Sequence, residues 1–330
     1  MTRTVRPLGE GGDGPVRAVR GRLSRAGASR GAVVLVGAAV ASVMTMPGGS
    51  VRVGAQTAPV VSGVERVLSV SLVDSEPVKS AFARCPDGKA VVGGGATAST
   101  EFLGADPERL TLTQLQPTTN IDGQGGDAYV VSAAETSPGV SGDWGVAAYA
   151  ICADSESVPG WEIVTAHTTT SSAQMQSQAA VCPSGKSVLG TGASVSHNGG
   201  QVRLQVARSS DPGDIARAQA HEQAGGYPRR WSLAAYAICA NTPTGYQVVT
   251  GPSDEAASEQ WKFATAICPE DKQMLSPGAA ITDIAPGHVS LQVVFPDILL
   301  RAVHVRAVEN TPLNNGWDRI IARGICVDRP

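Results

Sequence analysis

The six cysteines of this chain occur in three copies of one pattern, and this repeat constrains the fold more than any other feature. The first cysteine of each copy opens a Cys-Pro-x-x-Lys segment, and the three segments align without a gap at Cys85, Cys182 and Cys268. The second cysteine of each copy closes an apolar stretch, at Cys152, Cys239 and Cys326. Self-similarity at a fixed period indicates a repeat architecture. The pattern therefore predicts three units of one kind, although it specifies no chemistry.

The phase of the repeat is constant along the chain. Consecutive closing cysteines are 87 residues apart, and the same spacing separates three glutamates, Glu135, Glu222 and Glu309. We therefore expect three β units over residues 60–158, 159–244 and 245–330. The first unit is longer between its cysteines, and its extra residues lie in a stretch rich in Gly and Asp from 118 to 144.

Within a repeat, short apolar segments separated by turn residues predict about six strands and little helix. In the second repeat these segments are 161–165, 176–181, 187–196, 202–206, 216–222 and 231–239. Proline and glycine in Cys182-Pro-Ser-Gly-Lys186 favour a tight turn, so we expect a hairpin there. Segment 231–239 is apolar on both faces, which predicts a central strand. The expected fold class is all-β, with three repeated antiparallel units.

Two arrangements fit three such units: a β-prism-like pseudo-threefold body, or three small β-sandwiches in tandem. The third repeat departs from the other two. Trp317 stands nine residues before its closing cysteine, whereas Trp144 and Trp231 stand eight before theirs. Because a shift of one residue moves a side chain to the other face of a strand, we expect Trp317 to point outward. Arg319 and Arg323 also replace apolar residues near it.

The cysteines are predicted to form disulfides. Six cysteines allow 15 pairings, and sequence alone does not select one. Repetition favours one bond within each repeat, joining Cys85 to Cys152, Cys182 to Cys239 and Cys268 to Cys326. Each bond would stabilise the fold by roughly 4 kcal/mol in the chain-entropy model. Metal-binding or catalytic thiols are a poorer interpretation, since no Cys-x-x-Cys occurs and the five histidines share no repeat position.

The first 55 residues have the layout of a secretory signal peptide. A basic n-region, residues 1–30, precedes an uncharged apolar h-region, residues 31–46, and Val53-Gly54-Ala55 suits cleavage. The alternative is a membrane anchor formed by residues 31–46, but 16 residues are short for a span. After cleavage we expect an extracellular protein with no stable membrane insertion.

Cleavage would also change the charge of the protein. It removes eight of the 26 basic residues and two of the 29 acidic ones, so the net charge moves from −3 to near −9. An acidic protein lacks the basic footprint that binding to a phosphate backbone requires. Nucleic acid is therefore not an expected partner.

The repeat resembles one found in secreted proteins of high-GC Gram-positive bacteria, most of which have no assigned activity. The resemblance rests on Cys85-Pro-Asp-Gly-Lys-Ala-Val-Val-Gly-Gly-Gly-Ala96 and on the Ala-Tyr-Ala-Ile-Cys endings at Cys152 and Cys239. It covers nearly all of residues 60–330. A looser similarity, to vitelline membrane outer layer protein with its three repeated β units, implies a β-prism. Neither resemblance implies catalytic residues or a cofactor.

Candidate functional residues are few. The alternative is a secreted hydrolase that uses Glu135, Glu222 and Glu309, which share one repeat position. A retaining glycosidase requires two acids in each site, however, and no second acid shares this repeat position. The stretch 120–127 is rich in oxygen ligands like a calcium loop, but it lacks EF-hand spacing. Neither a metal nor another cofactor is expected.

Aromatic residues are the candidates for binding. They form only 4 % of the chain, and Trp161, Tyr246 and Trp317 are the ones that we single out, alongside Trp144 and Trp231. Such side chains either stack on sugar rings or fill the core. The preferred hypothesis is a secreted, non-catalytic binding or structural protein, with a polysaccharide or the cell wall as its partner.

Overall fold

The structure is a computed structural model that describes residues 57–99, 109–121, 123, 125–196, 199–253, 259–282, 287–313 and 316–330. The predicted signal peptide lies outside these residues. Each repeat contributes six strands. Repeat 1 forms β1 (Glu65–Val70), β2 (Val78–Arg84), β3 (Lys89–Ser99), β4 (Leu110–Thr118), β5 (Ala128–Glu135) and β6 (Gly145–Asp154). Repeat 2 forms β7 (Glu162–His167), β8 (Met175–Val181), β9 (Lys186–Val195), β10 (Val202–Ser209), β11 (Ile215–Glu222) and β12 (Leu233–Asn241). Repeat 3 forms β13 (Gln247–Pro252), β14 (Trp261–Ile267), β15 (Lys272–Ile281), β16 (Val289–Pro296), β17 (Ala302–Glu309) and β18 (Ile320–Asp328).

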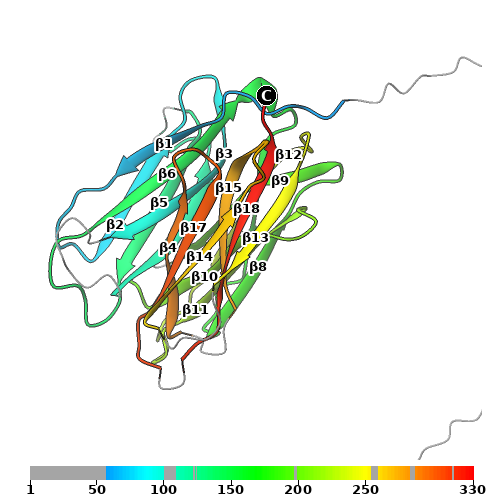
Figure 1. Cartoon of the computed structure of the whole chain (residues 1–330). Coiled ribbons are helices and arrows are strands. Elements are labelled where there is room, and N and C mark those ends of the chain that lie inside the picture. The colour runs from blue at the N-terminus through cyan, green and yellow to red at the C-terminus, as the bar shows by residue number, and fades with distance from the viewer. Residues whose placement is uncertain are drawn as a thin grey trace, which may run out of the picture. The chain divides into compact units, whose positions relative to one another are not determined.

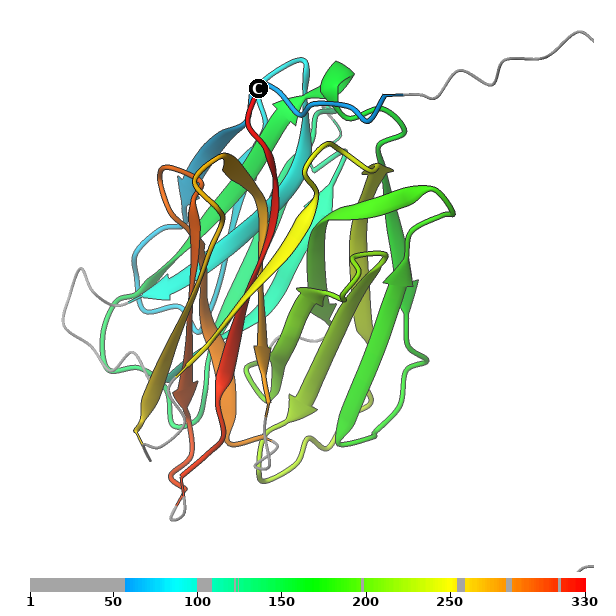
Figure 2. The same cartoon turned by 45° about the vertical axis from the view of Figure 1, so that its right-hand side comes forward.

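These strands form three six-stranded antiparallel sheets, which confirms the all-β prediction (Figures 1 and 2). No α-helix occurs among the described residues, where a 3-10 turn at Ser155–Ser157 follows β6. Sheet I has the order β1-β6-β3-β16-β17-β14, sheet II the order β2-β5-β4-β9-β12-β7, and sheet III the order β13-β18-β15-β10-β11-β8. Each sheet takes three strands from one repeat and three from another. The repeats are therefore joined in a β-prism-like pseudo-threefold arrangement, and three separate sandwiches in tandem are not formed.

The connection at each Cys-Pro-x-x-Lys segment is a turn but not a hairpin, so that part of the sequence prediction is wrong. The turn itself is present, because the amide of Lys186 donates to the carbonyl of Pro183 over 3.1 Å. However, β8 pairs with β11 in sheet III, whereas β9 pairs with β12 and β4 in sheet II. The turn thus carries the chain from one sheet to the facing sheet. Proline and glycine specify a reversal of direction, but long-range packing decides which strands pair.

The disulfides join the facing sheets within each repeat. Their pairs are Cys85–Cys152, Cys182–Cys239 and Cys268–Cys326, as the repeat favours. In each pair the first cysteine follows a strand of one sheet and the second lies in a strand of another. The closing strands β6, β12 and β18 lie inside their sheets. Strand β12 is buried on both faces, as predicted for segment 231–239, whereas β18 leaves Ile321 and Arg323 half-buried.

The lysine of each segment ties the turn to the start of its own repeat. Lys186 Nζ donates to the carbonyl oxygen of Gly160 over 2.5 Å, and Lys272 Nζ donates to that of Gly245 over 2.7 Å. Lys89 makes the same bond to Gly63. The contact is kept although the lysine follows the glycine by 26 residues in repeats 1 and 2 and by 27 in repeat 3.

Glycines of the motif allow backbones to approach each other closely. Strands β3, β9 and β15 touch one another at the centre of the molecule. A Cβ on Gly93 would lie 2.1 Å from the carbonyl oxygen of Leu275, and one on Gly190 would lie 2.3 Å from that of Val92. Side chains at these two positions would therefore push the strands apart, and the third repeat carries the small Ser276 there.

The core that these sheets enclose is filled mainly by small residues. Inward positions hold Ala, Val and Leu, while Trp144 and Trp231 are the bulkiest fully buried side chains. In β14 the alternation is inverted: Ala264 and Ala266 face inward, while bulky side chains face outward. The third inward residue of β14 is Lys262, whose buried ammonium donates to the carbonyls of Trp317 and Asp318. This inversion determines where exposed apolar surface appears.

Candidate functional site

The repeat-phased glutamates hold the loops that follow their strands. Glu222 accepts hydrogen bonds from the indole N–H of Trp231 (3.0 Å) and from the amide of Tyr227 (3.0 Å). Glu135 accepts equivalent bonds from the Trp144 indole (2.9 Å) and from the amide of Val140 (3.2 Å). Both carboxylates are therefore occupied by structural hydrogen bonds.

The third repeat has lost half of this arrangement. Glu309 accepts from the amide of Leu313. The indole of Trp317 donates to the carbonyl of Glu259 over 2.9 Å, as that of Trp231 donates to the carbonyl of Ala173 over 3.1 Å, but its bond to the glutamate is missing. The one-residue shift therefore accompanies loss of the bond to the glutamate, whereas the bond to the carbonyl is kept. Trp317 is nevertheless only 6 % exposed, and the ammonium of Lys262 lies 4.7 Å from the centre of its ring. The expectation that Trp317 points outward is wrong, because its ring packs against the buried ammonium of Lys262 and its indole N–H donates to the carbonyl of Glu259.

The two aromatic residues that open repeats 2 and 3 connect neighbouring repeats. Trp161 donates its indole N–H to the carbonyl of Val91 in repeat 1 over 2.8 Å. Tyr246 donates its hydroxyl to the carbonyl of Val188 in repeat 2 over 2.8 Å, and burial raises the pKa of this hydroxyl. Both side chains pack against the core. Their positions suit joining the repeats rather than stacking on a ligand.

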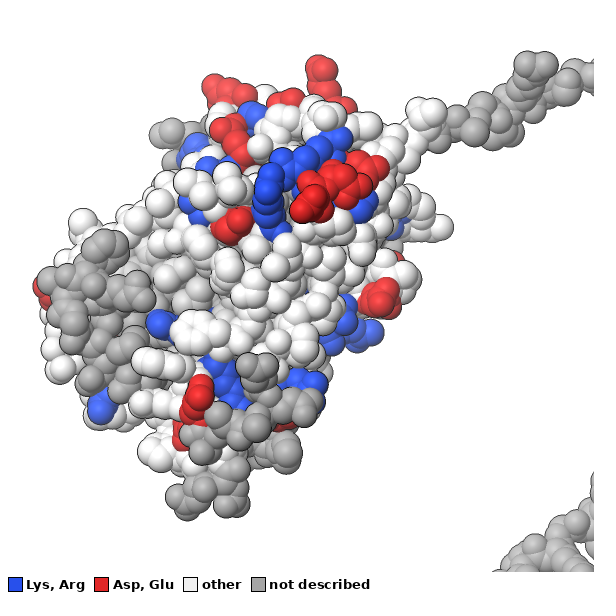
Figure 3. All heavy atoms as spheres, in the orientation of Figure 1, with Lys and Arg blue, Asp and Glu red and all other residues white. Residues whose placement is uncertain are grey.

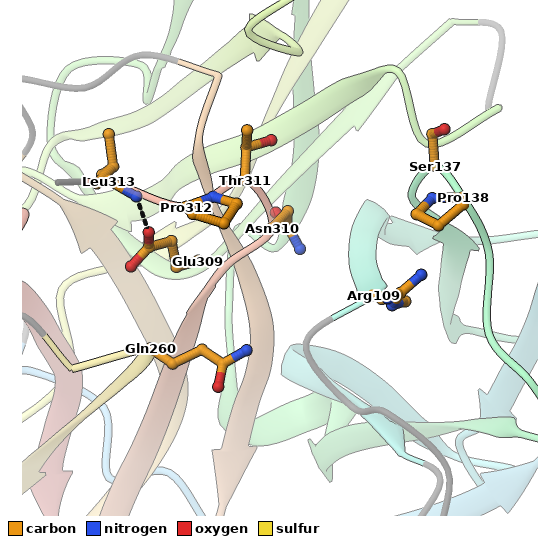
Figure 4. Close-up of a pocket in the computed structure, with 9 residues that line it drawn as sticks. All are labelled: Arg109, Ser137, Pro138, Gln260, Glu309, Asn310, Thr311, Pro312 and Leu313. Atoms are coloured by element: carbon orange, nitrogen blue, oxygen red, sulfur yellow. Dashed lines mark hydrogen bonds between the residues drawn. The ribbon is translucent and has the colours of Figure 1, made fainter.

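A hollow of about 560 Å³ lies between loops of repeats 1 and 3 (Figure 4). Arg109, Ser137 and Pro138 lie on one side of it, and the segment from Glu309 to Leu313 lies on the other. Among the residues that line it, Glu309 is the one carboxylate, and its hydrogen bond to Leu313 is drawn in Figure 4. The described residues of the hollow therefore do not include the pair of acids that hydrolysis of a glycosidic bond requires.

The oxygen-rich stretch 120–127 uses its described side chains for backbone hydrogen bonds. Asn120 accepts from the amide of Gly125 over 3.1 Å, and Asp127 accepts from the amide of Val91 over 2.9 Å. Asp122 lies outside the described residues, as does His197. Within the described ranges, no three His, Cys, Asp or Glu side chains gather as metal ligands would.

The outer face of sheet I presents a cluster of rings that the sequence did not reveal. Tyr149 on β6 and Phe295 on β16 meet edge to face with ring centres 5.1 Å apart, across Gly95, which has no side chain. Phe295 stacks on His304 of β17 at 6.0 Å, and His304 Nδ1 lies 3.0 Å from the hydroxyl of Thr265 on β14. These residues form one row across the sheet.

Exposed apolar side chains flank this row at both edges of sheet I. On β14, Trp261 is 43 % and Phe263 is 57 % exposed, and their ring centres are 6.3 Å apart. On β1, Leu68 and Val70 are about half exposed. We call this surface, formed by the row and these flanking side chains, the aromatic face.

The aromatic face also contains a shallow hollow of about 210 Å³. Its lining residues are Leu68, Val70, Val73, Thr97, Ser99, Gly145, Ala147 and Tyr149. Beside it, the guanidinium of Arg66 lies 5.2 Å from the ring centre of Tyr149 and 5.4 Å from that of Phe295. In the view of Figure 3, charged side chains gather toward the two ends of the strands, and the surface between them is largely uncharged. The arrangement can bind a ligand that has both apolar faces and hydroxyl groups.

One pattern in the sequence points to this surface. In residues 261–267, Trp-Lys-Phe-Ala-Thr-Ala-Ile, the large apolar side chains of Trp261, Phe263 and Ile267 all fall in one alternating set. Such alternation predicts a strand, and the usual interpretation places the bulky face inward. In an aromatic-poor protein with an alanine-lined core, the bulky face of an edge strand is a better candidate for the surface.

No protein-family model matches the chain, and no curated protein matches it either. The three disulfides indicate folding in an oxidising environment. No helical segment in the described part of the chain has the length and hydropathy of a membrane span.

Proposed function

We propose that this protein is a secreted, non-catalytic binding protein that holds a polysaccharide on the aromatic face of sheet I. The observation that carries the proposal is the exposure of Trp261 and Phe263 beside the row of Tyr149, Phe295 and His304. The hollow of about 210 Å³ supports it, because it offers apolar walls to one face of a sugar ring.

The aromatic face has partners for both the apolar faces and the hydroxyl groups of a sugar. Pyranose rings have apolar C–H faces that pack on aromatic side chains, and they have hydroxyl groups at their edges. Trp261 and Phe263 supply exposed rings, while Thr97, Ser99 and the guanidinium of Arg66 supply hydrogen-bonding groups. The open outer face of sheet I also suits an extended polymer better than a small, enclosed ligand.

Secretion rests on the signal-like residues 1–55, on the disulfides, and on the resemblance to secreted repeat proteins of high-GC Gram-positive bacteria. The non-catalytic character rests on the glutamates. Because Glu135 and Glu222 each accept two structural hydrogen bonds, they are poorly placed to act as acids or bases. A hydrolase using these residues has no observation in its favour.

The test is retention of the purified protein, residues 56–330, on insoluble cellulose, chitin and peptidoglycan. Replacing both exposed rings, Trp261→Ala with Phe263→Ala, is expected to weaken retention about tenfold, since each stacking contact contributes about 0.5–1.5 kcal/mol. Phe82→Ala is the matched control, because Phe82 is a 42 % exposed aromatic residue on an edge strand of sheet II.

Two results would overturn the proposal. One is equal retention of the double variant and the wild type; the other is no retention of the wild type on any of the three polymers. Sedimentation velocity adds a further check. If the wild type self-associates and the double variant does not, a second copy of the chain covers this face instead.

A further inference from the structure

Three arginines lie in one row across the outer face of sheet III. Arg217 on β11 pairs directly with Arg208 on β10. Arg323 on β18 pairs with Gly278 on β15, and a Cβ on Gly278 would lie 3.1 Å from the Cα of Arg208. The order across the sheet is therefore Arg217, Arg208, Gly278 and Arg323. Glycine leaves the space between Arg208 and Arg323 without an intervening side chain. We call these three arginines the arginine row.

Two of these guanidinium groups converge on one acceptor. Nη1 of Arg208 and Nη1 of Arg323 each donate to the carbonyl oxygen of Ser209 over 3.2 Å. Like charges held side by side repel each other, and partial burial removes water that would screen them. Burial and the positive charges of Arg323 and Arg217 together lower the pKa of Arg208.

Among the described residues, no acidic side chain forms an ion pair that offsets this charge. None of the ion pairs among the described residues includes an arginine of the row. The buried Nε atoms of Arg208 and Arg323 have no hydrogen-bond partner there either. Acidic residues outnumber basic ones after residue 55, so acids to pair these arginines are not scarce in the chain. An uncompensated basic cluster in an acidic protein favours an external anion as its partner.

The other two sheets show that the fold does not require these arginines. The position of Arg323 holds Tyr149 in sheet I and Tyr236 in sheet II, each three residues before the closing cysteine. Arg208 and Arg217 correspond to Phe295 and His304 in sheet I. A structural requirement would place similar residues at all three equivalent sites.

We propose that the arginine row is a binding site for an oxyanion, namely a sulfate, phosphate or carboxylate group. Guanidinium groups bind such groups through paired hydrogen bonds of matching geometry. The anion lies over Gly278, between Arg208 and Arg323, with Arg217 at one end of the site. The site is separate from the aromatic face, so the two proposals stand or fall independently.

The test measures binding of labelled dextran sulfate, sodium polygalacturonate and unsubstituted dextran by residues 56–330 at low ionic strength, where surface charges are least screened. The wild type is expected to bind the two charged polymers and not the neutral one. Arg323→Tyr and Arg208→Gln are each expected to weaken this binding about tenfold, the loss expected for a charge-assisted hydrogen bond. Competition by inorganic phosphate or sulfate would show that the site also accepts the free anion.

Arg301→Gln is the matched control, because it removes the same charge from an exposed loop residue outside the row. It is expected to bind as the wild type does. Arg323→Tyr restores the residue found in repeats 1 and 2, so its melting temperature should not fall, and lost binding then reports the site itself. The proposal is overturned if the wild type binds neither charged polymer. It is equally overturned if Arg301→Gln weakens binding as much as Arg323→Tyr does.

Discussion

Sheets I and III have the same strand arrangement, yet their outer faces are chemically opposite. Where sheet I carries Tyr149 and Phe295, sheet III carries Arg323 and Arg208. Sheet II is different again, since its outer face carries a hydrogen-bonded polar row, Ser80, Ser132 and Gln114. The inner faces of all three sheets hold the same kinds of small apolar residues. The comparison teaches that packing constrains the interior of each repeat, whereas the outer positions are free to specialise.

Sheets I and III can be compared in this way if they unfold as one cooperative body. Removing the disulfide that joins them tests this, and it is expected to give the largest loss of unfolding free energy among these predictions. Cys268 follows β14 of sheet I, and Cys326 lies in β18 of sheet III. The bond closes a loop of 58 residues, so the double variant Cys268→Ala with Cys326→Ala is expected to lose about 4 kcal/mol of unfolding free energy. Urea unfolding followed by fluorescence measures this loss.

A second disulfide serves as the control for that experiment. Cys85–Cys152 joins sheet II to sheet I and spans 67 residues, so removing it is expected to give a similar loss. If the variant without Cys268–Cys326 unfolds in two steps, sheets I and III are separate cooperative units and their comparison as one scaffold fails.

The sequence predicted the strands and disulfides well because their signals are local or repeated. The phase of the cysteines gave the pairing, and the six apolar segments of repeat 2 correspond to β7–β12. The partners of the strands were not predictable in the same way. A turn such as Cys182–Lys186 has the same sequence pattern whether it joins two strands of one sheet or strands of facing sheets.

The candidate sites were harder to predict than the fold. The shift of Trp317 was visible in the sequence, but its consequence depended on Lys262, which lies 55 residues away. Arg323 departs visibly from the repeat pattern, whereas its neighbours Arg208 and Arg217 do not. They join Arg323 only because β10 of repeat 2 pairs with β15 of repeat 3. Residues that assemble across a seam between repeats leave no pattern in either repeat alone.

A prediction of intermediate size concerns the loops at the ends of β11 in sheet III and β17 in sheet I. Glu222 accepts from two donors, the Trp231 indole and the Tyr227 amide, whereas the described contact of Glu309 is with the Leu313 amide. In Glu222→Gln one of the two donors would face the NH₂ group of glutamine. We expect a loss of about 1–3 kcal/mol, and a smaller loss for Glu309→Gln, both measured by urea unfolding.

Repeat 1 provides the internal control for this difference. Glu135 accepts from the Trp144 indole and from the Val140 amide, so Glu135→Gln should resemble Glu222→Gln. Equal losses in all three variants would mean that the tryptophan contact contributes little, and that the third repeat does not differ from the others in this respect.

The smallest expected effect is a difference in the pH dependence of the melting temperature. It distinguishes a buried histidine of sheet III from an exposed histidine of sheet I. His221 on β11 is buried, and burial lowers the pKa of its ring below the usual 6.5. The amide nitrogen of Gln219 lies 3.0 Å from Nε2, which suits the neutral ring, because an amide donor needs an acceptor. As the pH falls below about 6.5, the unfolded chain takes up a proton that the folded protein resists, so stability is lost.

The melting temperature of His221→Gln should therefore fall less between pH 7 and pH 5 than that of the wild type. His304→Gln, at an exposed position on β17, should follow the wild type. If both variants have the wild-type slope, burial of His221 does not contribute to the acid sensitivity of this sheet.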